Sequence, residues 1–113
     1  MRVAQLRVLG GAMARVPADA TAFAHRQSKI MVNLAAFYEG PDDKPVRESW
    51  VTGFQAAVEQ EDKGAYVNFI GLESPDRIHA AYPKATLERL RKIKKQVDPD
   101  NLFSRNQNIV PAE

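Results

Sequence analysis

The sequence contains no cysteine, only two histidines and no long hydrophobic run. The absence of cysteine excludes disulfides, thiolate metal ligands and cysteine nucleophiles. His25 and His79 lie too far apart in the sequence to form a metal motif together, so no metal site is predicted. No apolar stretch approaches the roughly 20 residues of a membrane span. The first residues also lack a signal-peptide pattern, so the simplest expectation is a cytoplasmic protein that does not contact a membrane.

Motifs for hydrolysis and for nucleotide binding are also missing. There is no Gly-x-Ser-x-Gly sequence and no glycine-rich phosphate loop. The pair Gly10-Gly11 lacks the spacing of a dinucleotide fingerprint and is typical of a bulge or of a close approach between backbones. We therefore do not expect this chain to hold the diphosphate of a nucleotide by itself.

The charge balance gives little indication of a partner. The 113 residues carry a net charge of +2 and a pI near 9.0, and 44% of them are hydrophobic. These values fit one ordinary globular domain. Basic residues crowd the segment 89–95, but they alternate with an apolar stripe and have no interleaved aromatic residues. We interpret them as the solvated face of a helix, and no nucleic-acid binding is predicted.

Hydrophobic periodicity predicts an α+β fold, with an antiparallel sheet of three or more strands and helices on one face. Expected strands are 2–9 (continuing through 12–16), 29–38 and 65–70, and expected helices are 44–61, a short one opened by Pro75, and 83–97. The strand 29–38 is apolar on both faces, which favours the centre of a covered sheet. Gly64 is expected to cap the first long helix, and Asp98-Pro99 to stop the last one. Residues 100–113 are expected to form an extended tail.

Tyr66 and Asn68 are the polar residues of greatest interest. On a strand, positions i and i+2 share a face, so the phenol and the amide should project side by side. If they are buried, both groups need partners. Those partners are either structural or belong to a polar ligand, and the pattern alone favours the structural reading.

Several segments together resemble the berberine-bridge-enzyme-like family of FAD-linked oxidases. The most specific part is the run from Asp98 to Phe103 followed by Asn106-Gln107-Asn108-Ile109. The remaining matches are Tyr66-Val67-Asn68-Phe69, Ala80-Ala81-Tyr82, Leu9-Gly10-Gly11-Ala12 and Thr21-Ala22-Phe23-x-His25-Arg26. Their order and spacing agree with the family over nearly the whole chain.

The resemblance implies a place within a larger enzyme. Residues 1–82 would be part of a substrate domain, and residues 83–113 a C-terminal helix and a tail that returns to an FAD-binding domain or subunit. Tyr66 would line the substrate face as a candidate catalytic base. Tyr66, Asn68, Asn106 and Asn108 would contact the cofactor, FAD. Leu102 and Phe103 would anchor the tail by burial.

Two functions remain open at this stage. The first is the C-terminal portion of an FAD-dependent oxidoreductase that transfers hydride from a small-molecule substrate to flavin and is inactive alone. The second is a free-standing α+β module that binds or dimerises without catalysis, because a homodimer would cover its apolar surfaces.

Overall fold

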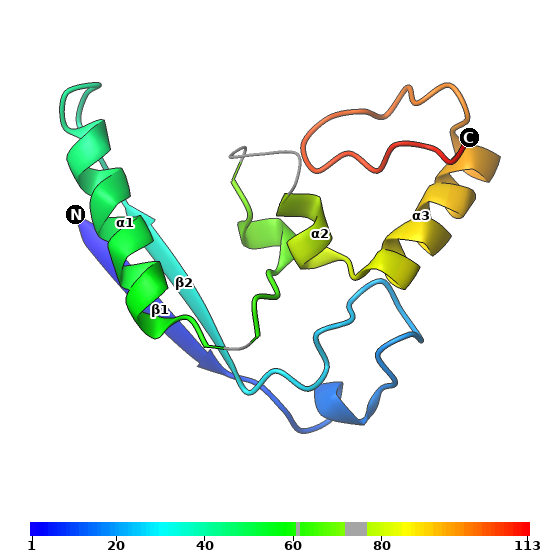
Figure 1. Cartoon of the computed structure of the whole chain (residues 1–113), viewed down its shortest axis with the longest axis horizontal. Helices are drawn as coiled ribbons and strands as arrows, with labels where there is room; N and C mark the ends of the chain where they lie inside the picture. The colour runs from blue at the N-terminus through cyan, green and yellow to red at the C-terminus, as the bar shows by residue number, and fades with distance from the viewer. Residues whose placement is uncertain (61, 72–76) are drawn as a thin grey trace. The chain divides into compact units, whose positions relative to one another are not determined.

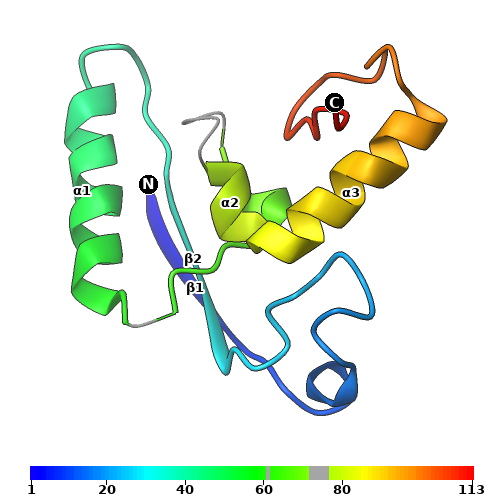
Figure 2. The same ribbon diagram turned by 45° about the vertical axis from the view of Figure 1, so that its right-hand side comes forward.

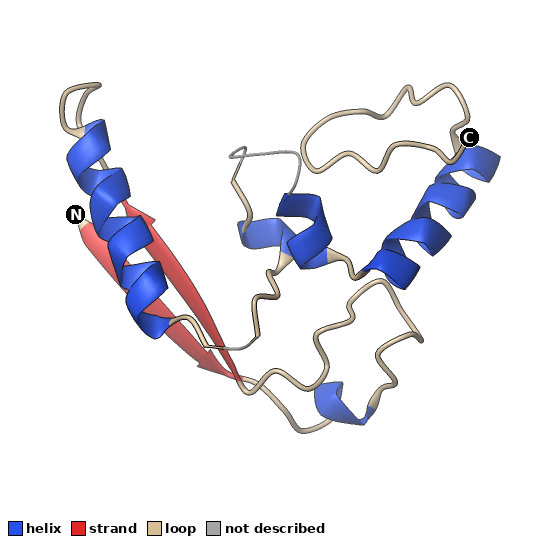
Figure 3. Cartoon of the chain, viewed as in Figure 1, coloured by secondary structure: helices blue, strands red, loops and turns tan. Residues whose placement is uncertain are grey.

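The computed structural model describes residues 1–60, 62–71 and 77–113 in two compact units. The sheet unit consists of Met1–Gly11 and Gln27–Lys63, and the helical unit consists of Ala12–Arg26 and Gly64–Glu113. Figures 1 and 3 show the elements of each. An α+β composition is confirmed. No described helix is long and apolar enough to cross a bilayer.

Two antiparallel strands form the sheet unit's framework. β1 (Arg2–Val8) pairs with β2 (Ile30–Ala36), with Leu6 opposite Val32 and Val8 opposite Ile30. The ladder continues past both ends, where Phe37 N donates to Met1 O and Leu9 N donates to Lys29 O. The first two expected strands are thus confirmed, with β2 shorter than predicted.

The helix α1 (Lys44–Val58) packs beside β2 (Figures 1 and 2). Trp50 and Phe54, one turn apart, meet edge to face at 5.5 Å between ring centroids. The guanidinium of Arg2 lies 5.6 Å from the Trp50 ring centroid, which joins β1 to the helix by a cation–π contact. The helix ends at Val58 rather than continuing to the predicted cap at Gly64, because Glu59 already has extended backbone angles.

One face of this sheet is apolar and open within its own unit. Cross-strand pairs place Leu6, Val8, Ile30 and Val32 on the same face. Val8 is 88% exposed and Leu6 66% exposed. The expectation that 29–38 is a covered central strand is therefore wrong for this unit, whose described residues form only a two-stranded sheet. Two strands alone are marginally stable in water, so this face is suited to further packing.

Gly10 and Gly11 turn the chain at the end of β1, and no other described segment packs closely against them. Both have positive φ, +133° and +59°, and a Cβ built on either would meet nothing within 4 Å. Among the described residues no neighbour approaches the pair closely, and the conformational freedom of glycine explains the positive φ angles. The expected strand over 12–16 is also wrong, because Met13–Arg15 form a 3₁₀ turn.

The helical unit is built around α2 (Ile78–Ala81) and α3 (Lys84–Val97). Its buried apolar residues are Ala81 and Leu87. The predicted strand over 65–70 is wrong: Val67–Phe69 form a 3₁₀ turn between extended flanking residues. The helix expected at Pro75 falls outside the described residues. Prediction of the helix 83–97 is confirmed, with Pro83 at its N-cap.

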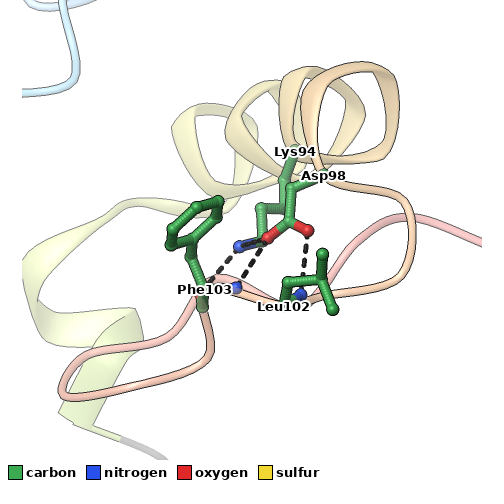
Figure 4. A network of polar contacts seen from close by, with 4 residues as sticks. All are labelled: Lys94, Asp98, Leu102 and Phe103. Atoms are coloured by element: carbon green, nitrogen blue, oxygen red, sulfur yellow. Dashed lines mark hydrogen bonds and ion pairs between the residues drawn. The ribbon is translucent and has the colours of Figure 1, made fainter.

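The tail after α3 has no regular secondary structure, turns at Asn101 and Asn106 instead of running extended as predicted, and is fixed at three places. Asp98 caps the helix and binds the backbone of Leu102 and Phe103 (Figure 4). Gln107 Nε2 donates to Ile70 O and Gly71 O. Near the end, Ala112 N donates to Arg91 O, and Arg91 Nε donates to Val110 O. The chain end therefore lies against α3.

Candidate functional site

Tyr66 and Asn68 are in direct contact. Asn68 Nδ2 donates a hydrogen bond to Tyr66 Oη at 2.7 Å. The expectation that these two polar groups lie together is met, although the backbone between them is a 3₁₀ turn rather than a strand. Since Asn68 supplies a donor to the phenol oxygen, the phenol's own hydrogen remains available to a ligand.

Aromatic rings surround Tyr66. The Phe23 ring meets it nearly perpendicularly, with centroids 5.9 Å apart, and the Phe69 ring lies at 5.5 Å. Phe23 is itself covered by Arg26, whose guanidinium lies 4.9 Å from the ring centroid and whose Nε donates to Phe23 O. The segment 21–26, far from Tyr66 in the sequence, thus forms one wall of the candidate site.

His25 ties that segment to α2. Its Nε2 lies 3.0 Å from Ala81 O, which requires the nitrogen to carry the proton and donate it. The imidazole also meets Phe23 edge to face at 6.0 Å. His25 is thus a structural tether, a role that the sequence did not reveal. The described residues contain no cluster of three potential metal ligands.

Two neighbouring, partly open hollows lie beside the Tyr66–Asn68 pair. The first is lined mainly by small and aromatic side chains: Ala22, Phe23, Ala65, Tyr66, Ala81 and Tyr82. The second is lined by Ile70, Gly71, Arg105, Asn106 and Gln107. Val67, Asn68 and Tyr82 line both hollows. The two therefore share a wall, and Asn68 and Tyr82 stand at the boundary.

Tyr82 is a residue that sequence reasoning did not single out. Burial raises the pKa of its phenol above the usual value, and the neighbouring Tyr66 acts in the same direction. Tyr82 is therefore a neutral hydrogen-bonding group in the site. Phe23, Arg105 and Gln107 were likewise missed as site residues, since nothing in their local patterns links them to Tyr66.

The two tail asparagines are placed differently. Asn106 lines the second hollow and adopts a left-handed conformation, with φ of 56°, in which its carbonyl accepts a bond from Asn108 N. Asn108 lines neither hollow, and its buried Oδ1 has no hydrogen-bond partner among the described residues. Tyr66, Asn68 and Asn106 thus line the hollows, whereas Asn108 lines neither of them.

Comparison with known proteins identifies relatives over most of the chain. Residues 65–110 match the family model described as berberine and berberine like. The FAD-linked oxidoreductase YgaK of Bacillus subtilis is 33% identical over 93% of this chain. Xylooligosaccharide oxidase of Thermothelomyces thermophilus is 34% identical over 90% of it, and berberine bridge enzyme-like C-1 of Nicotiana tabacum is 28% identical over 91%.

These matches cover only a part of each relative. The chain corresponds to 23% of YgaK, 22% of xylooligosaccharide oxidase and 24% of the tobacco protein. It therefore spans about a quarter of the length of these curated relatives. The four candidate residues lie within the 65–110 match to the family model.

Proposed function

This chain is related to part of the berberine-bridge-enzyme-like FAD-linked oxidoreductases, and from that premise we propose that it supplies the substrate side of such an enzyme. The complete enzyme would transfer hydride from a substrate C–H bond to FAD. The observation that carries the proposal is the Tyr66–Asn68 pair, which presents a phenol into a hollow with an aromatic wall. The 113 residues alone would be inactive.

Asn68 would position the phenol, and Tyr66 would contact the substrate. Asn68 fixes the phenol oxygen through its donated hydrogen bond, so that Tyr66 can orient a substrate hydroxyl. Tyr66 would also act as the base that receives the hydroxyl proton, which requires its phenolate form. Phe23 would hold the substrate ring through edge contacts.

The residues present fit one part of FAD only. Amide groups of Asn68 and Asn106 could hydrogen-bond the polar edge of the flavin ring. Asn108 Oδ1, which has no partner among the described residues, could accept a hydrogen bond from the cofactor or from the FAD-binding domain. No segment of the sequence fits the diphosphate. When bound, FAD would supply the electron acceptor, and most of its site would lie in the FAD-binding domain or subunit.

The exposed apolar residues of the tail favour that domain as the partner. Leu102 is 78% exposed and Phe103 81% exposed, while their backbone is held by Asp98. Large apolar side chains on a fixed backbone lose little further entropy when they are buried by a partner. We assign this surface to contact with the FAD-binding domain.

The first experiment is to sequence the coding DNA upstream of Met1. An open frame or adjacent gene for an FAD-binding domain is the expected result. The joined or co-expressed protein should then bleach its flavin absorbance when the substrate is added without oxygen. Tyr66→Phe should slow this bleaching at least about 100-fold if the phenol is the base. Unchanged bleaching in Tyr66→Phe would remove Tyr66 from the chemistry.

A second candidate function is a self-associating module, which the open sheet face favours. Leu6, Val8, Ile30 and Val32 would be buried between two copies. Light scattering over a range of concentrations tests this, because a dimer forms by mass action. A strict monomer at the highest concentration would exclude it.

A further inference from the structure

Tyr82 is the phenol of the site that has no part in the function proposed above. It lines both hollows, and Asn68 is the other polar residue on that shared wall. The Tyr82 side chain is half-buried, and its hydroxyl has no hydrogen-bond partner among the described residues. A tyrosine in such surroundings ordinarily uses its hydroxyl in a hydrogen bond. The hydroxyl is therefore available to a molecule that enters the first hollow.

The backbone that carries Tyr82 is fixed relative to Tyr66. Tyr82 N donates to Ile78 O at 2.9 Å and so closes the last turn of α2. Ala65 N donates to Ala80 O at 2.9 Å, which ties the residue before Tyr66 to the same helix. Side chains on segments that are tied together in this way keep their relative positions, as a binding site requires. The two phenols thus form one pair on a common support.

The two phenols differ in their surroundings. The Asn68 amide donates to Tyr66 Oη, as it would to the phenolate that a base requires. Burial raises the pKa of Tyr82, and the neighbouring Tyr66 raises it as well. Where two titratable groups share a site, the one whose charged form is disfavoured is the partner that keeps its proton. Tyr82 is therefore suited to donate a hydrogen bond and unsuited to act as the base.

We propose that Tyr82 contacts the substrate and donates a hydrogen bond to the same hydroxyl oxygen whose proton passes to Tyr66. The proposal deepens the function given above and rests on its assignment of Tyr66 as the base. The substrate O–H bond breaks and its proton forms the O–H bond of Tyr66, while Tyr82 keeps its own proton. A donor at this oxygen directs the substrate hydroxyl and stabilises the negative charge that develops as the proton leaves.

The first test measures binding to the 113-residue chain, without flavin. The chain has three tyrosines, so labelling each ring with ¹³C at the carbon that bears the hydroxyl gives three signals, which single substitutions by phenylalanine assign. Benzyl alcohol is the probe, and toluene is the matched ring without a hydroxyl. Benzyl alcohol should shift the signals of Tyr66 and Tyr82. The signal of Tyr38, which belongs to the sheet unit, should stay in place.

A matched pair of variants separates a hydrogen bond from packing. Tyr82→Phe keeps the ring and removes the hydroxyl, so it should weaken binding of benzyl alcohol about threefold to tenfold, the range for one lost hydrogen bond. Binding of toluene should be unchanged in the same variant. Tyr38→Phe makes the same chemical change outside the helical unit and should leave both probes unaffected. A purely structural role of Tyr82 would instead weaken both probes together.

Flavin bleaching in the longer protein separates this proposal from the function on which it rests. Tyr82→Phe should raise the half-saturating substrate concentration and slow the saturated rate less than Tyr66→Phe does. Bleaching that depends on Tyr66 but not on Tyr82 would reject the role of Tyr82 and leave the function intact. Bleaching that is unchanged in Tyr66→Phe would reject both.

Three binding results would also overturn the proposal. The first is unchanged affinity for benzyl alcohol in Tyr82→Phe, and the second is an equal loss of affinity for both probes in that variant. The third is the absence of any shift at Tyr66 and Tyr82 with either probe in a chain whose amide spectrum is dispersed.

Discussion

Lys94 and Asp98, one helical turn apart, form an ion pair at the C-terminal end of α3 (Figure 4). The same carboxylate accepts hydrogen bonds from Leu102 N at 2.8 Å and Phe103 N at 3.1 Å, and Lys94 Nζ also donates to Phe103 O. One aspartate thereby stops the helix, pairs a lysine and fixes the turn that follows. Asn101, with φ of 53°, makes that turn possible.

Replacing Asp98 should free the tail without dissolving α3. In Asp98→Ala, the amides of Leu102 and Phe103 lose their acceptor and should exchange with solvent much faster, while amides in the middle of α3 keep their protection. Amide hydrogen exchange measures both. Asp100→Ala is the matched control, because Asp100 is exposed and contributes nothing to this network. Equal exchange in the two variants would contradict this role.

The same network should weaken in acid. The hydrogen bond from Lys94, first, and those from Leu102 and Phe103 hold the pKa of Asp98 below its ordinary value of 3.8, against the opposing effect of burial. A group whose pKa is lower in the folded state stabilises it fully above the ordinary pKa and loses that effect as the pH falls through the lowered value. The protection of the Phe103 amide, taken relative to its intrinsic exchange rate at each pH, should therefore fall below about pH 3.8.

Asp43 provides a comparison for that pH dependence. Its pKa is also lowered, chiefly by the hydrogen bond from Arg47, at the start of α1. Acid should weaken both the Asp43–Arg47 pair at the start of α1 and the Asp98 network at the end of α3. Only Asp98→Asn should remove the pH dependence of amide protection at Phe103. Persistence of the same dependence in Asp98→Asn would show that another group governs the tail.

Truncation of two leucines of the helical unit should change the free energy of unfolding by very different amounts. Leu87 is 8% exposed, so Leu87→Ala should lower the free energy of unfolding by about 2 kcal/mol or more. Leu102 is 78% exposed, so Leu102→Ala should change it by less than about 0.5 kcal/mol in the isolated chain. Chemical denaturation followed by circular dichroism checks both. If the tail packs on an FAD-binding domain, Leu102→Ala should weaken that association.

Loss of the His25 tether should loosen the aromatic wall. His25→Ala leaves Ala81 O without its donor and should cost about 1 kcal/mol. His25→Gln, which keeps an N–H donor, should recover part of this. The chemical shifts of the Phe23 ring report the change directly. Unaltered Phe23 signals in His25→Ala would show that the segment 21–26 is held by other contacts.

The sequence predicted best the elements whose pattern is long and periodic. The stripe of Leu87, Leu90 and Ile93 located α3, and two apolar runs located β1 and β2. It failed at Ala65–Ile70 because six residues of alternating pattern do not separate a strand from an extended segment with a 3₁₀ turn. Tyr66 and Asn68 are nevertheless hydrogen-bonded, since a strand and a 3₁₀ turn both bring residues i and i+2 within reach of each other.

The rest of the candidate site depends on contacts between distant segments. Phe23 reaches Tyr66, and Arg105 reaches the hollow beside Asn68, only through the fold of the helical unit, which His25 and Gln107 help to hold. Neither tether has a local signature. Resemblance to a family could name Asn106, but it could not indicate that Arg105 and Tyr82 share a hollow with it.

The division of the chain into units has a consequence for folding. The connection between β1 and β2 carries residues 12–26 into the helical unit, so neither unit is a continuous stretch of sequence. β1 and β2 must therefore pair across a large loop, which slows folding relative to a local hairpin. No single cut releases either unit whole: a chain begun at Gly64 would lack the segment that holds Phe23 against Tyr66. A shortened chain made for expression should therefore keep both stretches of sequence that form each unit.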